Sequence, residues 1–244
     1  MDQSIKFEPI GRGKFVAVSK NHTFGTDAVL LAAFSKARKK DFLVDLGTGC
    51  GIVPFLLLRE NLLVRAIGVD IMSEATELAA LSAEKNGFDN FSAINADIND
   101  LKGRQELFGT TLVTCNPPYK AIGAGITNTD TSKLTARHET TCTLSGIVKA
   151  AANLLQTGGR FCVCQRPERA AELMYLMKKD GLEPKRMRLV AKKTGEKPWL
   201  VLIEGRRGGN TGLDIEPTLY LYGENGELSG EMLEIYGEYK KDFL

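Results

Sequence analysis

Four consecutive residues, Asn116-Pro117-Pro118-Tyr119, follow a short apolar run and could do chemistry on an amino group. Two prolines after an asparagine make a rigid, extended turn, which would point the Asn116 side-chain oxygen and the Pro117 carbonyl at one spot. The lone pair of an sp² amino nitrogen is delocalised, and two acceptors on its N–H groups help to localise that pair toward an incoming electrophile. Tyr119 adds a flat face on which a base can stack, worth about 1–3 kcal/mol. The alternative is a simple proline turn at the end of a strand.

A glycine-rich loop follows a second short apolar run. Phe42–Leu46 reads as a buried strand with Asp45 near its end. Gly47, Gly49 and Gly51 then alternate with other residues before a helical pattern begins. Glycine tolerates positive φ and lets a ligand approach the backbone, and the helix end offers unpaired N–H groups. The spacing is G-x-G-x-G and not the dinucleotide pattern G-x-G-x-x-G, although a generic α/β turn remains an alternative.

Two further strand patterns also end on acids. Asp70 closes the first and precedes Ile71, and Asp97 closes the second and precedes Ile98. A carboxylate at the position of Asp70, about twenty residues after a glycine loop, can accept from both ribose hydroxyls of a nucleoside. Because sites in α/β folds form at the carboxyl ends of the strands, we expect these acids, the glycine loop and Asn116 to cluster.

The elements that must position these residues alternate along the chain. Strand and helix patterns follow each other five times and lead to two strands, Arg186–Val190 and Trp199–Ile203, that should pair antiparallel. This order predicts an α/β fold with a seven-stranded, mostly parallel sheet and one reversed strand. Residues 1–20 predict a small N-terminal hairpin around Gly11-Arg12-Gly13.

Helix ends can also be placed from the sequence. Thr26-Asp27 and Ser73 are candidate N-terminal caps of two helices. Gly87 is a candidate C-terminal stop for the second of these helices. Gly158-Gly159 should close a later helix that begins at Leu144.

The composition is that of an ordinary globular protein. The chain has 244 residues, 43% of them hydrophobic and 25% charged, which suffices for one large α/β domain. No apolar stretch is long enough to span a bilayer, and the N-terminal residues do not form a signal peptide. The five cysteines show no C-x-x-C spacing, so we expect neither disulfides nor a metal site, and a reducing cytoplasmic location.

The charge is unevenly distributed. Residues 160–210 contain thirteen Lys and Arg against six Asp and Glu, whereas residues 211–244 contain eight acids and two lysines. A basic sector beside an acidic tail suggests a surface for an anionic polymer. A solvated face of mixed charge is the alternative.

The acids and the glycine loop together resemble motifs I and II of the Rossmann-like S-adenosylmethionine methyltransferases of class I. Asp45 lies where a pyrophosphate would be unwelcome, which favours the cationic methionine end of that cofactor. The turn His22-Thr23-Phe24-Gly25 resembles the element that folds over this end in the same enzymes. Its alternative interpretation is a loop cap with a packed Phe24.

The tetrapeptide at Asn116 matches motif IV of amino-group methyltransferases that act on adenine N6 or on glutamine amides. Nearly the whole chain resembles the bacterial tRNA1(Val) adenosine-37 N6-methyltransferase family. The further segments that carry this resemblance are His22-Thr23-Phe24-Gly25-Thr26-Asp27, Ala136-Arg137-His138-Glu139, Arg166-Pro167-Glu168-Arg169 and Leu202-Ile203-Glu204-Gly205.

This resemblance implies a site and a fold. The implied cofactor-binding residues are Phe24, Gly25, Thr26, Asp45, Gly47, Gly49, Gly51, Asp70, Ile71, Asp97, Ile98 and Asn116. The implied catalytic residues are Asn116, Pro117 and Tyr119, and the implied substrate-binding residues are Tyr119, Arg137, His138 and Arg166. We expect one methyltransferase domain over residues 1–244, with a hairpin and cofactor-covering helix in 1–40 and an acidic tail in 205–244. The implied cofactor is S-adenosyl-L-methionine, with S-adenosylhomocysteine as product, and the implied partner is tRNA.

Two other functions fit parts of the sequence. A glutamine amide of a peptide-release factor could be the acceptor, although enzymes of that kind usually carry a separate N-terminal helical domain. A non-catalytic RNA-binding module could have kept the fold, but the intact motifs argue against it. Arg137 and His138 could contact substrate or order their loop.

Overall fold

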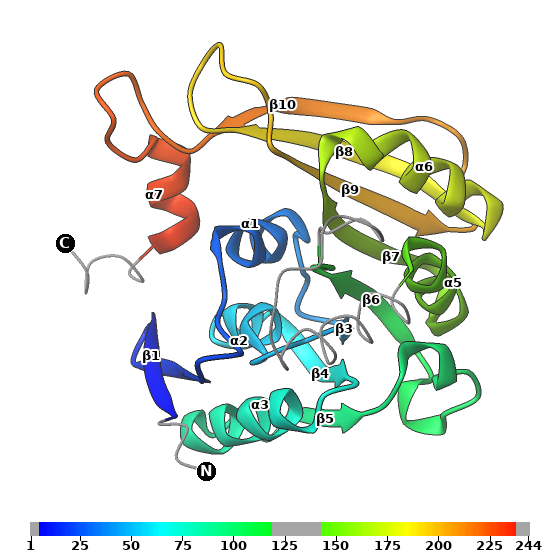
Figure 1. Ribbon diagram of the computed structural model, residues 1–244. Helices are drawn as coiled ribbons and strands as arrows, with labels where there is room; N and C mark the ends of the chain where they lie inside the picture. Colours follow the sequence, from blue (N-terminus) through cyan, green and yellow to red (C-terminus); the bar gives the residue numbers. More distant parts are fainter. Residues whose placement is uncertain (1–4, 119–142, 238–244) are drawn as a thin grey trace, which may run out of the picture.

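The computed structural model describes residues 5–118 and 143–237. Eight strands form one sheet in the order β10-β8-β9-β7-β6-β3-β4-β5 (Figure 1). Their bounds are β3 (Asp41–Leu46), β4 (Leu63–Asp70), β5 (Phe91–Asn95), β6 (Thr110–Cys115), β7 (Leu155–Gln165), β8 (Leu182–Ala191), β9 (Leu200–Arg207) and β10 (Asp214–Tyr220). Among these strands β9 alone runs antiparallel to its neighbours, so the predicted single reversed strand is confirmed.

The strands predicted from apolar runs form the centre of the sheet. All six residues of β3 are buried, and the chain pairs β3 in parallel with both β4 and β6. Central parallel strands read as continuous apolar runs because helices cover both of their faces. The sheet has one strand more than the seven expected, since β10 adds to its edge beside β8.

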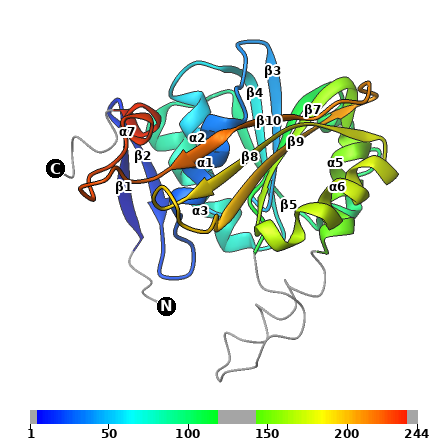
Figure 2. The same cartoon turned by 90° about the horizontal axis from the view of Figure 1, so that it is seen from above.

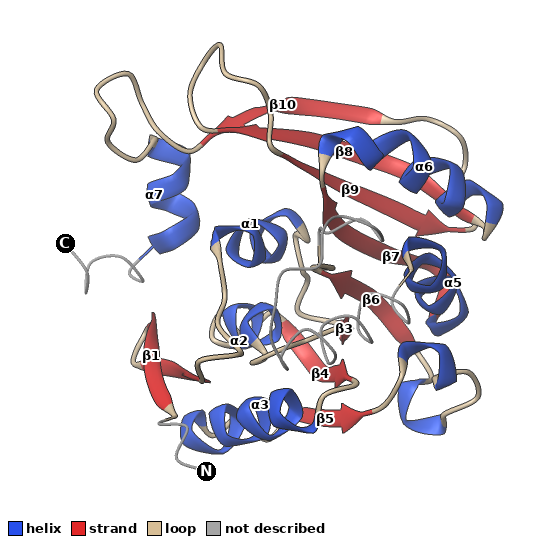
Figure 3. Ribbon diagram, in the orientation of Figure 1, coloured by secondary structure: helices blue, strands red, loops and turns tan. Residues whose placement is uncertain are grey.

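Helices cover the two faces of the sheet, as Figures 2 and 3 show. On one face lie α1 (Thr26–Phe34), α2 (Ile52–Leu58) and α3 (Ser73–Asn86), and on the other lie α5 (Leu144–Leu154) and α6 (Ala170–Lys179). Neighbouring residues of β3 point to different faces, so Leu43 packs with the first group and Val44 with the second. Three short 3₁₀ turns are η1 (Ile98–Asp100), η2 (Gln105–Leu107) and η3 (Pro167–Arg169).

The predicted N-terminal hairpin is confirmed as a separate two-stranded sheet of β1 (Lys6–Gly11) and β2 (Lys14–Val18). It packs on α3, because the Ala17 amide donates to Ser82 Oγ at 2.8 Å and the Phe15 amide donates to Asn86 Oδ1 at 2.9 Å. The hairpin therefore braces the helix that follows β4.

Some predicted helix ends are wrong by a residue or more. The residue that caps α3 is Met72, which makes no side-chain capping bond, and Ser73 is the first helical residue. Gly25 occupies the cap position of α1. Gly87 does end α3, in the left-handed region at φ 66°. Glycines 158 and 159 lie inside β7, because α5 runs directly into that strand.

The acidic C-terminal region contains regular structure. After β10, the helix α7 (Gly230–Tyr236) packs against α1. Ser229 caps α7 by accepting from the Met232 amide. Tyr236 is buried, and its hydroxyl is 3.1 Å from Thr26 Oγ1 at the start of α1.

A group of charged residues, here called the ion network, joins the far strands of the sheet to the end of α1. Arg160 lies 2.6 Å from Asp41, and Arg186 lies 2.8 Å from Glu204 and 2.9 Å from Glu216. Both arginines also donate to carbonyls at the end of α1. Its members are Lys36, Asp41, Arg160, Arg186, Glu204 and Glu216.

Candidate active site

The residues expected to do chemistry follow neighbouring parallel strands. They lie along the edge of the sheet that is formed by the carboxyl ends of these strands. The strand order β7-β6-β3-β4-β5 places the loop after β3 between the ends of β6 and β4. Leu46 pairs with Cys115 on one side and with Val69 on the other. Asp70 and Asn116 directly follow these partners and flank the glycine loop, so the predicted clustering of these residues at the strand ends is confirmed.

Asp70 is held by backbone amides. Its Oδ2 accepts from the Gly49 amide at 2.9 Å and its Oδ1 accepts from the Met72 amide at 3.0 Å. The side chain is buried, and no ion pair joins it to any residue in 5–118 or 143–237. A carboxylate oriented in this way keeps lone pairs for hydroxyl donors of a ligand.

The glycine loop requires glycine for two different reasons. Gly47, Gly49 and Gly51 all have positive φ, at 68°, 54° and 84°. A Cβ at Gly47 or Gly49 would meet no atom of the described residues within 4 Å, so these residues leave the space over this backbone open. A Cβ at Gly51, in contrast, would collide with the ring of Phe55 in α2. The loop thus exposes bare backbone to a ligand and packs closely on the helix that follows.

Asp45 lies beneath this loop and is almost completely buried. Burial raises the pKa of Asp45 to about 7, and the nearby charge of Asp70 acts in the same direction. The Thr114 hydroxyl opposes this effect by donating to Asp45 Oδ1 at 2.6 Å. Asp45 therefore sits where a cation nearby would favour its charged form.

Asp97 caps the 3₁₀ turn η1, because its Oδ1 accepts from the amide and from the side-chain nitrogen of Asn99, each at 2.8 Å. Ile98 is buried against the α5 face of the sheet. Ile71, directly after Asp70, is 41% exposed. An exposed isoleucine beside a polar edge gives an apolar surface against which a ligand can pack.

Asn116 and Pro117 follow β6 at the same edge. Asn116 is half-buried and Pro117 is buried. The thiol of Cys164, on the neighbouring strand β7, donates to Asn116 Oδ1 at 3.0 Å. The predicted positions Tyr119, Arg137 and His138 lie outside the described residues.

The turn before α1 is joined to the C-terminal region. Phe24 is half-buried and packs against the core on the α1 face, whereas Gly25 is exposed. Thr26 is linked to Tyr236 by the hydroxyl contact described above. Arg166 follows β7 at the same edge as Asn116, and its guanidinium donates to the Trp199 carbonyl at 3.1 Å.

Part of the basic sector is neutralised by the acidic region. Arg186 belongs to the ion network, and Arg188 lies within hydrogen-bond distance of Glu231 at the start of α7. Glu216 of β10 forms ion pairs with both Lys36 and Arg186. These cations are therefore structural.

Other cations of the basic sector face solvent. Lys192 and Lys197 are exposed in the loop between β8 and β9, and Lys193 is half-buried there. None of the three forms an ion pair with another described residue. Because β8 is parallel to β6, this loop lies at the same edge of the sheet as Asn116.

Three partners of the site were not found from the sequence: Thr114 beside Asp45, Cys164 beside Asn116, and Tyr236 beside Thr26. Thr114 gave a signal, since it is a polar residue inside an apolar strand pattern. Cys164 and Tyr236 gave none, because their contacts depend on which strands and helices become neighbours.

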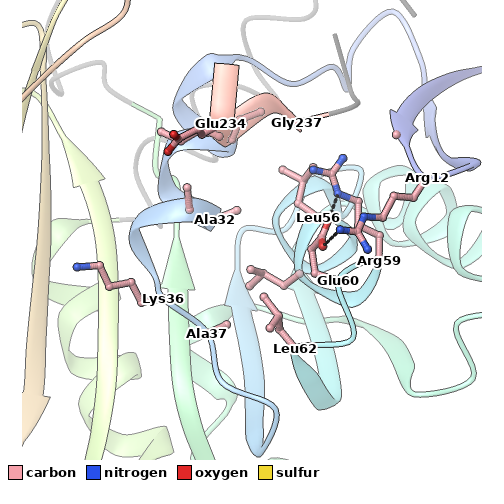
Figure 4. Close-up of a pocket in the computed structure, with 15 residues that line it drawn as sticks. Arg12, Ala32, Lys36, Ala37, Leu56, Arg59, Glu60, Leu62, Glu234 and Gly237 are labelled. Carbon is pink, nitrogen blue, oxygen red and sulfur yellow. Dashed lines mark ion pairs between the residues drawn. The ribbon is translucent and has the colours of Figure 1, made fainter. Parts of the chain in front are cut away.

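A cavity of about 410 Å³ lies elsewhere, between α1, α2, α7 and the turn of the hairpin (Figure 4). Arg12 and Arg59 pair with Glu60 at its wall. None of the predicted site residues that the structure describes lines this cavity. In the described ranges no three His, Cys, Asp or Glu side chains gather as a metal site would require, and no helix there is both long and apolar enough for a bilayer.

A family model described as a methyltransferase domain matches residues 37–206. The chain belongs to this methyltransferase family. It is 27% identical over 180 residues to a protein of Bacteroides fragilis named tRNA1(Val) (adenine(37)-N6)-methyltransferase, covering 73% of this chain and 75% of that protein. Several other relatives carry the same name.

Solved structures share the fold. A predicted O-methyltransferase from Agrobacterium tumefaciens superposes with a TM-score of 0.67 at 19% identity, covering 87% of this chain and 96% of that chain. The geranyl diphosphate C-methyltransferase of Streptomyces coelicolor, in complex with S-adenosyl-L-homocysteine, gives a TM-score of 0.54 at 16% identity and covers 75% of this chain and 77% of that chain.

Membership of the methyltransferase family implies S-adenosylmethionine as the cofactor, and the residues at the edge fit it. The backbone of Gly47 and Gly49 is open, the Asp70 carboxylate is oriented by amides, and Asp45 is buried without a cationic partner among the described residues. Such a set suits a ligand that carries hydroxyls and a positive charge.

Proposed function

We propose that this protein transfers a methyl group from S-adenosylmethionine to the N6 amino group of an adenine in tRNA, adenosine 37 of tRNA1(Val). The observation that carries the proposal is the position of Asn116, which directly follows the β6 residue paired with Leu46, the last residue before the glycine loop. An acceptor site for an amine thus lies beside the cofactor site. The names of the matched relatives support the choice of tRNA as substrate.

The binding half of the site uses residues of this chain. Asp70 accepts hydrogen bonds from the ribose hydroxyls, and Ile71 and Ile98 provide the apolar surroundings of the adenine ring. The backbone of Gly47 and Gly49 approaches the methionine end, whose positive charge favours ionised Asp45. When bound, the cofactor supplies an electrophilic methyl group.

The acceptor half orients the amine. Asn116 Oδ1 and the Pro117 carbonyl accept from its two N–H groups, which localises the nitrogen lone pair toward the methyl group. Tyr119 supplies the face on which the adenine stacks, and Arg137, His138 and Arg166 contact the substrate around it. The amine can lose its proton after methyl transfer, so the reaction requires no general base.

A base within an RNA loop must be turned out of its stack to enter such a pocket. The surrounding RNA then needs cations, since phosphate contacts supply most of the sequence-independent affinity. The loop with Lys192, Lys193 and Lys197 lies at the same edge of the sheet as Asn116, where it could make these contacts. A tRNA substrate also places the protein in the cytoplasm.

The test uses purified protein, unmodified tRNA1(Val) and mass spectrometry of the nucleosides. The wild-type protein should form N6-methyladenosine at position 37. Asn116→Ala should lose about 100-fold or more in kcat, because a group aimed at the reacting atoms acts mainly in the transition state. Its affinity for S-adenosylmethionine, measured by calorimetry, should stay within about twofold of wild type.

The control is Asn153→Ala, which removes an exposed asparagine from α5 and should leave both measurements unchanged. Near-wild-type turnover of Asn116→Ala would exclude the acceptor role. A wild-type protein that leaves tRNA unmethylated but methylates the glutamine amide of a release factor would replace the proposed substrate, because the same tetrapeptide suits both planar amines.

A further inference from the structure

One hydrogen bond to the acceptor residue comes from a side chain that the proposed chemistry does not use. Cys164 lies near the end of β7, is completely buried, and has its Sγ 3.0 Å from Asn116 Oδ1. The same thiol also lies 4.0 Å from the Cys115 carbonyl oxygen, so the amide oxygen of Asn116 is the nearer of its two acceptors. Cys164 thus contacts the one amide whose orientation the reaction depends on.

The direction of this bond selects one orientation of the amide. A thiol donates through its S–H and accepts only weakly, whereas an amide offers an oxygen acceptor at one end and N–H donors at the other. With the oxygen end beside the thiol, the S–H group has an acceptor. The reversed amide would place N–H groups against a poor acceptor, so Cys164 favours the orientation with Oδ1 toward β7.

The bond from Cys164 does not by itself exhaust the lone pairs of the amide oxygen. An amide oxygen has two lone pairs, so it can accept from Cys164 and from an N–H of the acceptor amine together. A thiol is a weak donor, so its bond to Oδ1 orients the amide but uses little of the acceptor strength of that oxygen.

We propose that Cys164 is a positioning residue for methyl transfer, which holds Asn116 Oδ1 in place through its thiol. This inference rests on the proposed role of Asn116. It assigns a function to a buried cysteine that otherwise reads as core packing.

A second cysteine on the same strand provides a matched comparison. Cys162 is also completely buried, packs in the same cluster on the α1 face, and lies two residues earlier on β7. Its thiol lies 3.7 Å from Glu204 of the ion network and makes no contact with the acceptor residue. Replacing either cysteine by alanine removes one thiol from the same face of the same strand.

The kinetic experiment compares Cys164→Ala, Cys164→Ser and Cys162→Ala with the wild-type protein. Cys164→Ala should lower kcat for tRNA about five- to tenfold, the effect of losing one modest hydrogen bond, with unchanged affinity for S-adenosylmethionine. Cys164→Ser should restore kcat to within about twofold, since its hydroxyl can donate to the same oxygen. Cys162→Ala should keep the wild-type kcat, and thermal unfolding checks that each variant is folded.

A second measurement needs neither substrate nor cofactor. The S–H stretching band of a cysteine lies in a clear region of the infrared spectrum and moves to lower frequency when the thiol donates a hydrogen bond. The difference between wild type and Cys164→Ala isolates the band of Cys164. Asn116→Ala should move this band to higher frequency.

These two measurements separate the inference from the proposed function. An unmoved Cys164 band in Asn116→Ala overturns the inference, and so does an equal fall in kcat for the two alanine variants, because it indicates packing alone. A moved band in a protein that fails to methylate tRNA supports the hydrogen bond and overturns the proposed substrate.

Discussion

The carboxylates of the candidate active site and those of the ion network are held in opposite ways. Asp45 and Asp70 have hydroxyl and amide donors around them but no cation among the described residues. Glu204 and Glu216 lie within 3 Å of arginine. The pKa values differ accordingly. Burial alone would raise the pKa of Glu216, but hydrogen bonds from Lys36 and Arg186 keep it below its usual value, whereas the pKa of Asp45 rises to about 7.

This difference indicates which acids serve the fold and which serve a ligand. A buried carboxylate that is paired with a cation of the protein has its charge compensated within the fold, and the pair links neighbouring strands. A buried carboxylate without one is held at a cost that a cationic or hydroxyl-bearing ligand can relieve. The buried carboxylates described beside the glycine loop, Asp45 and Asp70, are of the second kind, which is what the proposed binding of S-adenosylmethionine there requires.

The largest effect on stability is expected in the ion network. Glu204→Gln keeps the side-chain volume but removes the charge that Arg186 contacts. Loss of one partner from a buried ion pair costs about 3–5 kcal/mol in the free energy of unfolding, because the remaining charge stays buried. Chemical denaturation measures this loss. Glu172→Gln, which breaks the exposed pair with Arg169, is the control and should cost less than about 1 kcal/mol. Equal losses of stability in the two variants would show that the buried ion pair contributes no more to stability than the exposed one.

The effect of replacing Asp70 should instead appear in the affinity for the cofactor. Asp70→Ala should weaken the binding of S-adenosylmethionine by about 1–3 kcal/mol, the range for lost hydrogen bonds to a charged group. Calorimetry on the folded variant gives this value, and Asp89→Ala, an exposed acid beyond α3, is the control. An unchanged affinity in Asp70→Ala would contradict the ribose contact.

Asp45 should make the stability of the folded protein depend on pH. Because its pKa is raised to about 7 in the folded protein, the folded chain binds more protons than the unfolded chain between about pH 4 and pH 7. The contribution of Asp45 to stability is therefore complete below about pH 4 and is lost as the pH rises through 7. Asp45→Asn removes this contribution but keeps an acceptor for Thr114.

The free energy of unfolding, measured across this range without cofactor, should consequently fall less steeply with pH in Asp45→Asn than in wild type. Parallel curves for the two proteins would mean that folding leaves the pKa of Asp45 unshifted, which would contradict the cost of burial inferred for this carboxylate.

The smallest effect is expected from exposed cations. Lys192→Glu combined with Lys193→Glu should weaken tRNA binding and flatten its dependence on salt, by about 0.7–0.9 in the logarithmic slope for each phosphate that the protein no longer neutralises. Affinity for the cofactor should not change. Lys39→Glu with Lys40→Glu makes the same change in charge at the opposite edge of the sheet and serves as the control. Identical slopes for the two double variants would show that the β8–β9 loop is only a solvated face.

The sequence predicted the parts of the fold that are marked by apolar runs and glycines. Central strands such as β3 are buried on both faces, so their existence and the acids near their ends could be predicted, and the bounds of β3 to within one residue. Strand β10 was missed because it lies at an edge and contains acids and Pro217, and such strands resemble tails. Ser73 was misplaced by one residue because capping propensity does not fix where the first helical turn begins.

The candidate site could be predicted only as far as each residue follows its own strand. That Asn116 and Asp70 cluster with the glycine loop was expected from parallel strands whose carboxyl ends lie together, whereas their flanking positions follow from the strand order β6-β3-β4. The contact of Cys164 with Asn116 depends on β7 lying beside β6, which an alternating strand pattern does not specify. Long-range packing, and not local chemistry, decides such partners.

The contact between Thr26 and Tyr236 joins residues 210 positions apart, and it ties the site to the order in which the chain is made. Synthesis begins at the N-terminus, so the turn proposed to cover the cofactor is complete long before α7 exists. A chain interrupted ahead of β10 would carry the glycine loop, Asp70 and Asn116 but no Tyr236 to hold that turn. The contact between the start of α1 and α7 can therefore form only in a molecule whose synthesis has run to α7.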